Sequence, residues 1–151
     1  MLKFAIITSF LSQTKDRFHV YNQPLDLDDK FKMMSEIEGY DGVEIVYPYE
    51  TSDSKTTRDA LTRYNLKVAA VNVNVKAEPE FRNGGLTSQD SETRAKAVKF
   101  IKDSKDFAAD IGADKVTCCP LGDGYEFSFQ YDYASAWKHL IETFSEAADY
   151  R

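Results

Sequence analysis

Residues 40–48 read YDGVEIVYP, and their centre, residues 42–46, is a short apolar run that begins at a glycine and is soon followed by a proline. A nearly continuous apolar run of this length is typical of a strand buried on both faces, as in a parallel sheet. Three further runs of this kind lie at residues 3–8, 68–75 and 115–119. These runs predict the strands of one sheet.

A helical pattern follows each predicted strand, at residues 28–38, 54–64, 89–111 and 134–150. Apolar residues recur at helical spacing in the first pattern (Leu27, Phe31, Met34 and Ile37) and in the last (Trp137, Leu140, Ile141, Phe144 and Ala147). Residues that favour helix ends flank the patterns: Ser52, Asp53 or Ser54 before the second, Thr87 or Ser88 before the third, and Gly39 and Gly112 after the first and third.

Strands that alternate with helices indicate an α/β fold with right-handed crossovers and a parallel sheet. We expect a single domain over residues 1–151. The alternation leaves two architectures open, an open sheet and part of a closed barrel. In both, functional sites are built by the loops that follow the strands. Most of these loops are long and rich in aromatic residues, so the candidate site residues are sought there.

The composition narrows the classes of function. The 151 residues carry 25 acidic and 19 basic side chains, a net charge of −6, which argues against a general nucleic-acid binder. No apolar run approaches the roughly 18 residues that a membrane span needs, and residues 1–10 are interpreted as a strand rather than a signal peptide. Cys118 and Cys119 are adjacent and match no disulfide or zinc pattern, so a reduced cytoplasmic protein is expected.

Three segments carry a family resemblance: FRNGGLTSQDSETR at residues 81–94, IGADKVTCCPLGDGYEFSFQ at residues 111–130, and YDGVEIVYP at residues 40–48. In this order and spacing they resemble the sugar phosphate isomerase/epimerase superfamily, which has a xylose-isomerase-like TIM barrel. The resemblance implies a (β/α)₈ barrel of about 250 residues or more. Since the chain contains only four βα units, it is expected to be the N-terminal half of such a barrel.

The resemblance also implies a metal-dependent sugar isomerase or epimerase that moves a proton through an enediolate. Members of the superfamily hold a divalent metal (Mn, Mg, Co or Zn) with residues of strands five to eight, and two of these ligands transfer the proton. Those strands lie outside this sequence, so no catalytic or metal-binding residue is assigned here. The chain alone is expected to be inactive. The implied ligand is a small sugar or polyol.

The candidate substrate-binding residues follow from position, since they lie at or near the ends of the four predicted strands. They are Phe10, Glu44, Asn72, Asn74, Cys119, Asp123 and Tyr125. Glu44 has an alternative role in a structural hydrogen bond or ion pair, because a buried carboxylate needs a partner. Asn72 and Asn74 point to one face of their strand, where they would either bind sugar hydroxyls or form an internal network. The aromatic residues Phe127, Phe129, Tyr131 and Tyr133 are expected to pack their loop onto the helices rather than to cover a ligand.

Two other functions remain in competition. An abasic-site endonuclease of the same superfamily would carry zinc-binding histidines at the ends of early strands, whereas residues 118–124 read CCPLGDG and residues 72–75 read NVNV. A half barrel could also act without catalysis, as a module that self-associates through its free strand edges or forms a homodimer. We expect no nucleic-acid partner and no membrane partner.

Overall fold

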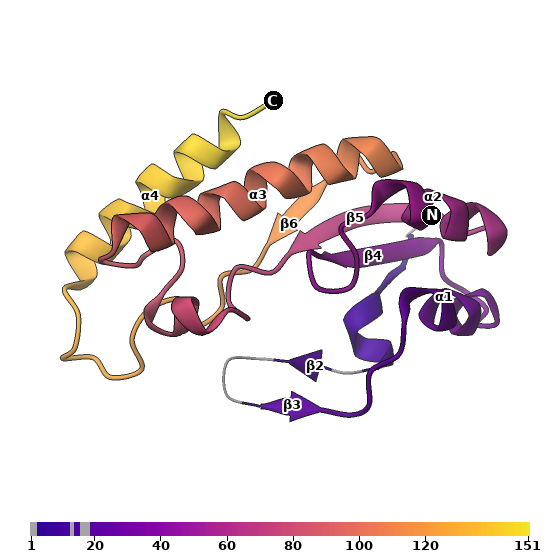
Figure 1. Ribbon diagram of the computed structural model, residues 1–151, viewed down its shortest axis with the longest axis horizontal. Helices are drawn as coiled ribbons and strands as arrows, with labels where there is room; N and C mark the ends of the chain where they lie inside the picture. Colours follow the sequence, from indigo (N-terminus) through magenta and orange to yellow (C-terminus); the bar gives the residue numbers. More distant parts are fainter. Residues whose placement is uncertain (1–2, 13, 16–18) are drawn as a thin grey trace.

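The protein, studied as a computed structural model, is described over residues 3–12, 14–15 and 19–151. In this part, four parallel strands form one sheet in the order β1-β4-β5-β6 (Figure 1). The strands are β1 (Ala5–Ile7), β4 (Gly42–Tyr47), β5 (Val68–Val73) and β6 (Val116–Cys118). The four predicted strands are therefore confirmed, each within two residues of its predicted ends.

The main helices are α1 (Leu27–Ser35), α2 (Ser54–Arg63), α3 (Ser91–Ile111) and α4 (Tyr133–Ala148). The long helix α3 lies along the sheet against β5 and β6, and α4 packs on α3 (Figure 1). Two short 3₁₀ helices, η1 (Thr8–Leu11) and η2 (Pro79–Asn83), follow β1 and β5. None of the helices in the described residues is long and apolar enough to cross a membrane.

The segment between β1 and α1 contains an element that the sequence did not predict. Here β2 (Thr14–Lys15) and β3 (Val20–Tyr21) pair as a small antiparallel hairpin, which lies apart from the main sheet in Figure 1. Strands of two residues are too short to show an alternating pattern, which explains why this segment was predicted as a loop.

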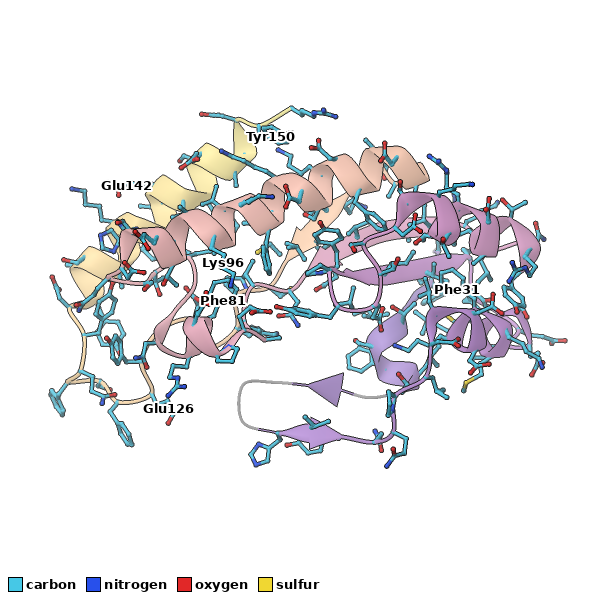
Figure 2. All side chains as sticks on the ribbon, viewed as in Figure 1. Phe31, Phe81, Lys96, Glu126, Glu142 and Tyr150 are labelled. Carbon is cyan, nitrogen blue, oxygen red and sulfur yellow. The ribbon has the colours of Figure 1, made fainter. Side chains whose placement is uncertain are left out.

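One face of the sheet is apolar and is covered by helices. Val43, Ile45 and Val71 are fully buried on this face. They share a core cluster with Phe107 of α3 and with Phe31 of α1 (Figure 2). Neighbouring residues of a strand point to opposite faces. The other face therefore carries the residues between them, and these are partly polar.

A second core cluster joins the far end of the sheet to α3 and α4. Val73, Phe81 and Leu86 are almost completely buried in it. Figure 2 shows Phe81 and Lys96 below α3. The Lys96 ammonium lies 5.7 Å from the centroid of the Phe81 ring. The loop between β5 and α3 is thereby fixed against the helix layer.

The ends of α1 and α3 differ from the prediction. Helix α1 ends at Ser35, so Ile37 lies beyond it and is 43% exposed. The Tyr40 hydroxyl donates a hydrogen bond to the Met34 carbonyl at this end, where the chain turns toward β4. Helix α3 is capped by Asp90, whose carboxylate accepts the Thr93 N–H at 2.9 Å, and not by Thr87 or Ser88.

The predicted buried face of α4 is correct only in part. Trp137 and Ile141 are 65% and 51% exposed, whereas Ala136, Thr143 and Ala147 are buried. The cause is the packing of α4, whose main contact is with α3. Helical spacing alone predicts which residues form an apolar stripe on a helix, but not how much of that stripe neighbouring elements bury.

Candidate substrate-binding site

The carboxyl ends of the four parallel strands surround a hollow of about 570 Å³. Phe10 of η1, Val46 of β4, Asn72 of β5, and Asn74 and Cys119 just beyond their strands contribute to its wall. We call this space the strand-end hollow. Its volume falls in the range of about 300–1,000 Å³ that is typical of small-ligand sites.

The structure brings together four of the seven substrate-binding candidates at the strand-end hollow: Phe10, Asn72, Asn74 and Cys119. Phe10 is 74% exposed, so its ring offers an open apolar surface. Glu44, Asp123 and Tyr125 do not line the hollow. These three side chains contact other parts of the protein, and their surroundings are described next.

Glu44 lies one layer below the hollow in a network of hydrogen bonds. Its Oε1 accepts a hydrogen bond from Asn72 Nδ2 at 2.9 Å and another from Thr117 Oγ1 at 2.6 Å. Asn72 Nδ2 also donates to Thr117 Oγ1 at 3.1 Å. Neighbouring strands β4, β5 and β6 each supply one member. Of the two roles expected for Glu44, the structure shows the structural hydrogen bond.

Asn74 forms a local turn at the rim of the hollow. Its Oδ1 accepts the backbone N–H groups of Lys76 at 3.0 Å and Ala77 at 3.1 Å. Its own N–H donates to the Tyr47 carbonyl at 2.9 Å. The side-chain oxygen of Asn74 is therefore engaged, and its amide nitrogen is the group left for a ligand.

Asp123 connects the loop after β5 with the loop after β6, and its own side chain does not line the hollow. Its carboxylate accepts the backbone N–H groups of Gly85 and Thr87, the latter at 2.8 Å. The two loops approach closely, since a Cβ added at Gly84 would lie 3.3 Å from the backbone nitrogen of Gly124 in the loop after β6. Asp123 thus holds the loop after β5 against the loop after β6, through bonds that act on the backbone.

The aromatic residues in the loop before α4 and at the start of this helix differ in how they pack. Tyr125 packs against Tyr131 in a tilted arrangement with 5.3 Å between ring centroids, and the Tyr131 hydroxyl donates to the Thr87 carbonyl. The exposed fractions are 67% for Phe127, 103% for Phe129 and 60% for Tyr133. The prediction that these rings pack the loop onto the helices is therefore confirmed for Tyr131 and wrong for the other three.

A buried ion pair in the wall of the hollow was not predicted. Lys30 of α1 and Glu50 form it, with side chains only 5% and 9% exposed. Glu50 Oε2 also accepts the Val46 N–H at 3.1 Å and the Thr8 hydroxyl. Lys30 follows Leu27 by three positions and precedes Met34 by four, so it lies on the buried stripe of α1. A lysine on such a stripe was the available signal.

The adjacent cysteines differ in environment. Burial raises the pKa of the Cys118 thiol to about 12, whereas Cys119 is exposed and lines the hollow. Because the thiolate is the reactive form of cysteine, Cys118 remains a neutral, inert thiol near pH 7. Of the two cysteines, Cys119 is the one that lines the hollow.

A model of the xylose isomerase-like TIM barrel family matches residues 31–151. The chain belongs to this family. Its four parallel strands and flanking helices are half of the barrel for which the family is named. The helix layer covers the outer face of this half barrel, so the face with Glu44, Asn72 and Thr117 corresponds to the barrel interior.

Known members and neighbours are longer than this half barrel. The xylose isomerase of Thermus thermophilus is 29% identical over 93 residues, which are 62% of this chain and 24% of that protein. A D-allulose 3-epimerase from Methylomonas sp., crystallised with D-allulose, superposes with a TM-score of 0.69 and 17% identity over 99% of this chain and 47% of its own. A family 2 AP endonuclease from Brucella melitensis gives 0.64 and 18% over 99% and 50%. The chain thus spans about half of these solved structures, and such identities indicate a shared fold.

The residues of this half barrel do not fit the divalent metal that the family implies. In residues 3–12, 14–15 and 19–151, no group of three or more histidine, cysteine, aspartate or glutamate side chains is arranged to hold a metal ion. The carboxylate of Glu50 is engaged by Lys30, Thr8 and Val46. No step of a reaction is therefore assigned to a metal bound by these residues.

Proposed function

We propose that the protein is a sugar isomerase or epimerase and that this chain supplies the substrate-facing wall formed by its four strands. The strand-end hollow carries the proposal, because barrel enzymes hold their substrates at the carboxyl ends of the strands. The names of the relatives support a sugar ligand: one is a xylose isomerase, and one neighbour was crystallised with D-allulose.

The wall suits a polyol because it combines amides with an apolar surface. Asn72 and Asn74 place amide groups at the hollow, and amides both donate to and accept from hydroxyl groups. The exposed ring of Phe10 can pack on the C–H face of a sugar. The charge of Lys30 is balanced by Glu50, so this pair does not make the wall strongly cationic.

The reaction that we propose for the complete barrel is proton transfer next to a carbonyl. One carboxylate takes the proton from the carbon, and the electron pair of that C–H bond moves toward the carbonyl oxygen to give an enediolate. A second carboxylate returns the proton. Return to the same carbon from the other side gives an epimer, and return to the former carbonyl carbon gives an isomer. We place both carboxylates and the divalent metal in strands that this chain does not contain.

Solvent exchange tests this proposal directly. The protein made from its natural gene is incubated in D₂O with D-fructose or D-tagatose, and with Mn²⁺, Mg²⁺, Co²⁺ or Zn²⁺ in turn. NMR should show deuterium on the carbon beside the carbonyl and the appearance of an epimer or an aldose. Asn72→Ala should lower kcat/KM about 10-fold through the loss of a hydrogen bond to the ligand. The matched control is Asn83→Ala, on an exposed residue of η2. Absence of exchange with all four metals and both sugars contradicts the proposal.

A homodimer or self-associating half barrel is the alternative, and one observation favours it. Strands β1 and β6 lie at the two edges of the sheet, and Trp137 and Ile141 of α4 are exposed. Two copies that pair through these surfaces would bury them. Light scattering coupled to size exclusion decides the question for this chain, since a dimer has twice the monomer mass of 17.2 kDa. A monomer at every concentration rules this alternative out.

We also propose that the protein acts in the cytoplasm on a small molecule and has no nucleic-acid or membrane partner. The net charge of −6 supports this view, because phosphate-rich surfaces repel an acidic protein. Cell fractionation with an antibody against the native protein is the corresponding measurement. Recovery in a membrane or secreted fraction would overturn the assignment.

A further inference from the structure

Glu44, Asn72 and Thr117 form a closed ring of hydrogen bonds whose donors and acceptors can be counted. Asn72 Nδ2 lies 2.9 Å from Glu44 Oε1 and 3.1 Å from Thr117 Oγ1, and these two oxygens are 2.6 Å apart. Both oxygens therefore lie on the same side of the nitrogen and share one of its two N–H groups. The Thr117 hydroxyl has one proton, and it donates to the same Glu44 oxygen. One amide proton and the hydroxyl proton are thus used inside the ring, and the second amide N–H is not.

This ring determines which end of the Asn72 amide faces the ligand. A carboxylate accepts hydrogen bonds and donates none, so the amide must turn its nitrogen toward Glu44. Asn72 Oδ1 has no hydrogen-bond partner in the part of the chain that the structure describes. Asn72 lines the strand-end hollow, whereas Glu44 and Thr117 lie outside its lining. Asn72 Oδ1 is therefore turned away from Glu44 and is an acceptor that a ligand can reach.

We propose that Glu44 and Thr117 are positioning residues that hold Asn72 as a hydrogen-bond acceptor, so that this point of the wall selects a hydroxyl group. The inference rests on the proposed function and specifies the group that Asn72 would bind, which is a hydroxyl group of the sugar. A carbonyl or phosphate oxygen at this point would meet another acceptor. A flipped amide would have the opposite preference.

Competition with sugar analogues tests this selection. Monodeoxy analogues of D-fructose, each lacking one hydroxyl, are measured as competitive inhibitors of D-fructose turnover. In the wild-type protein, one analogue should bind about 5- to 10-fold more weakly than D-fructose, the usual effect of a lost neutral hydrogen bond. In Glu44→Gln the amide of residue 72 is no longer held in one orientation. The penalty for that same analogue should then fall to less than about twofold.

A purely structural ring gives a different result, and this difference makes the proposal falsifiable. Loss of a structural contact would weaken all analogues equally and leave the ratio between them unchanged. Glu146→Gln, at an exposed residue of α4 outside the hollow lining, is the matched control for removal of a carboxylate. Should Glu44→Gln fail to fold, Thr117→Val removes one acceptor of the amide and serves as the second variant. An unchanged ratio in both variants overturns the proposal.

Exchanging the amide and the carboxylate between positions 72 and 44 should restore the affinity that a single substitution removes. Asn72→Asp alone sets two carboxylates against each other and should lower the affinity for D-fructose by about 10-fold or more. Adding Glu44→Gln supplies an amide that donates to the introduced carboxylate, whose second oxygen again faces the hollow as an acceptor. The double variant should recover to within about threefold of wild type and regain the discrimination. No recovery counts against the proposal.

NMR separates failure of this inference from failure of the proposed function. One of the two side-chain N–H signals of Asn72, assigned by their loss in Asn72→Asp, should exchange with solvent more slowly than those of exposed Asn83. In Glu44→Gln this Asn72 proton should exchange faster. These signals require no sugar. Slow exchange together with no turnover of D-fructose leaves the orientation of Asn72 established and rejects the function, whereas fast exchange in wild type rejects the inference.

Discussion

The carboxylate of Glu50 contacts residues of three elements. It binds Lys30 of α1, the Thr8 hydroxyl at the start of η1, and the Val46 N–H of β4. A buried charge is costly unless it is paired and hydrogen-bonded, and here the carboxylate has all of these partners. Glu50 therefore fixes the position of α1 relative to the strand ends.

Removal of this charge should destabilise the protein strongly. Glu50→Gln leaves the Lys30 ammonium buried without its counter-ion, so the free energy of unfolding should fall by about 3 kcal/mol. Adding Lys30→Met should restore part of the loss. The control is Glu142→Gln on α4, which breaks an exposed pair with Lys138 and should change stability by less than about 0.5 kcal/mol. Urea denaturation measures all of these variants, and equal effects at Glu50 and Glu142 would contradict the prediction.

The two cysteines should differ in reactivity. The pKa of Cys118 is raised to about 12, so at pH 8 only about 1 in 10,000 of its thiols is ionised. In Cys119→Ser, iodoacetamide should therefore label Cys118 very slowly at pH 8 and faster as the pH rises toward 12. In Cys118→Ser, the exposed Cys119 should react readily at pH 8. Mass spectrometry after timed quenching measures both rates, and rapid labelling of Cys118 at pH 8 would show that its thiol is not buried.

The sequence predicted which residues lie near the strand ends, but it did not predict which side chains pair with one another. Of the seven residues predicted from the strand ends, four line the hollow: Phe10, Asn72, Asn74 and Cys119. The other three, Glu44, Asp123 and Tyr125, do not. Lys30 and Thr117 were missed because their partners lie far away in the chain: Glu50 follows Lys30 by 20 positions, and Glu44 precedes Thr117 by 73. Such pairs come together only when the strands are aligned in the sheet.

At the scale of elements, Asp123 links the loop after β5 to the loop after β6. Its two oxygens accept backbone N–H groups of Gly85 and Thr87, in a loop that leads into α3. A side chain that binds backbone groups holds a loop whatever the loop's own side chains are. Asp123 therefore acts on loop geometry, although it was selected from the sequence as a candidate for binding the substrate.

Asp123→Ala should loosen this loop without opening the core. Two hydrogen bonds to a carboxylate are lost, so stability should fall by about 2–3 kcal/mol. Hydrogen exchange of the Gly85 and Thr87 amides should speed up, while the amides of β4 stay protected. Asp132→Ala, which removes only the cap of α4, is the matched control and should leave Gly85 and Thr87 unchanged. Unaltered exchange at Gly85 in Asp123→Ala would refute this role.

The elements themselves were largely predictable, and the two errors have different causes. The apolar runs predicted each strand of the main sheet, and Asp53 was among the caps expected for α2. The cap of α3 was misplaced because the segment 87–91 contains several residues that can cap a helix. The buried side of α4 was misjudged because it depends on which neighbours the helix has. Local patterns determine where elements form, whereas packing determines which of their faces are covered.

At the scale of the whole molecule, the sheet has two free edges. Strand β1 pairs only with β4, and β6 only with β5, among the described residues. Unpaired edges are sites of association, and the proposed function requires further strands to complete the barrel. The same edges would support the alternative of two associating copies.

The mass of the natural gene product is the most informative measurement at this scale. If the proposed function holds, the mass should be about 28 kDa or more, as for a complete barrel. The mass of the present chain is 17.2 kDa. Intact mass spectrometry of the protein purified from its source provides the value. A mass of 17.2 kDa would favour the self-associating half barrel instead.

The division of the sheet into an apolar outer face and a polar inner face bears on how such a protein changes during evolution. Val43, Ile45 and Val71 maintain the fold, whereas Asn72, one position along the same strand as Val71, faces the hollow. Substitutions on the inner face can alter ligand choice and leave the residues of the outer core in place. Mutational robustness and the capacity to acquire a new substrate therefore reside in alternate residues of the same strands, so one can vary with little effect on the other.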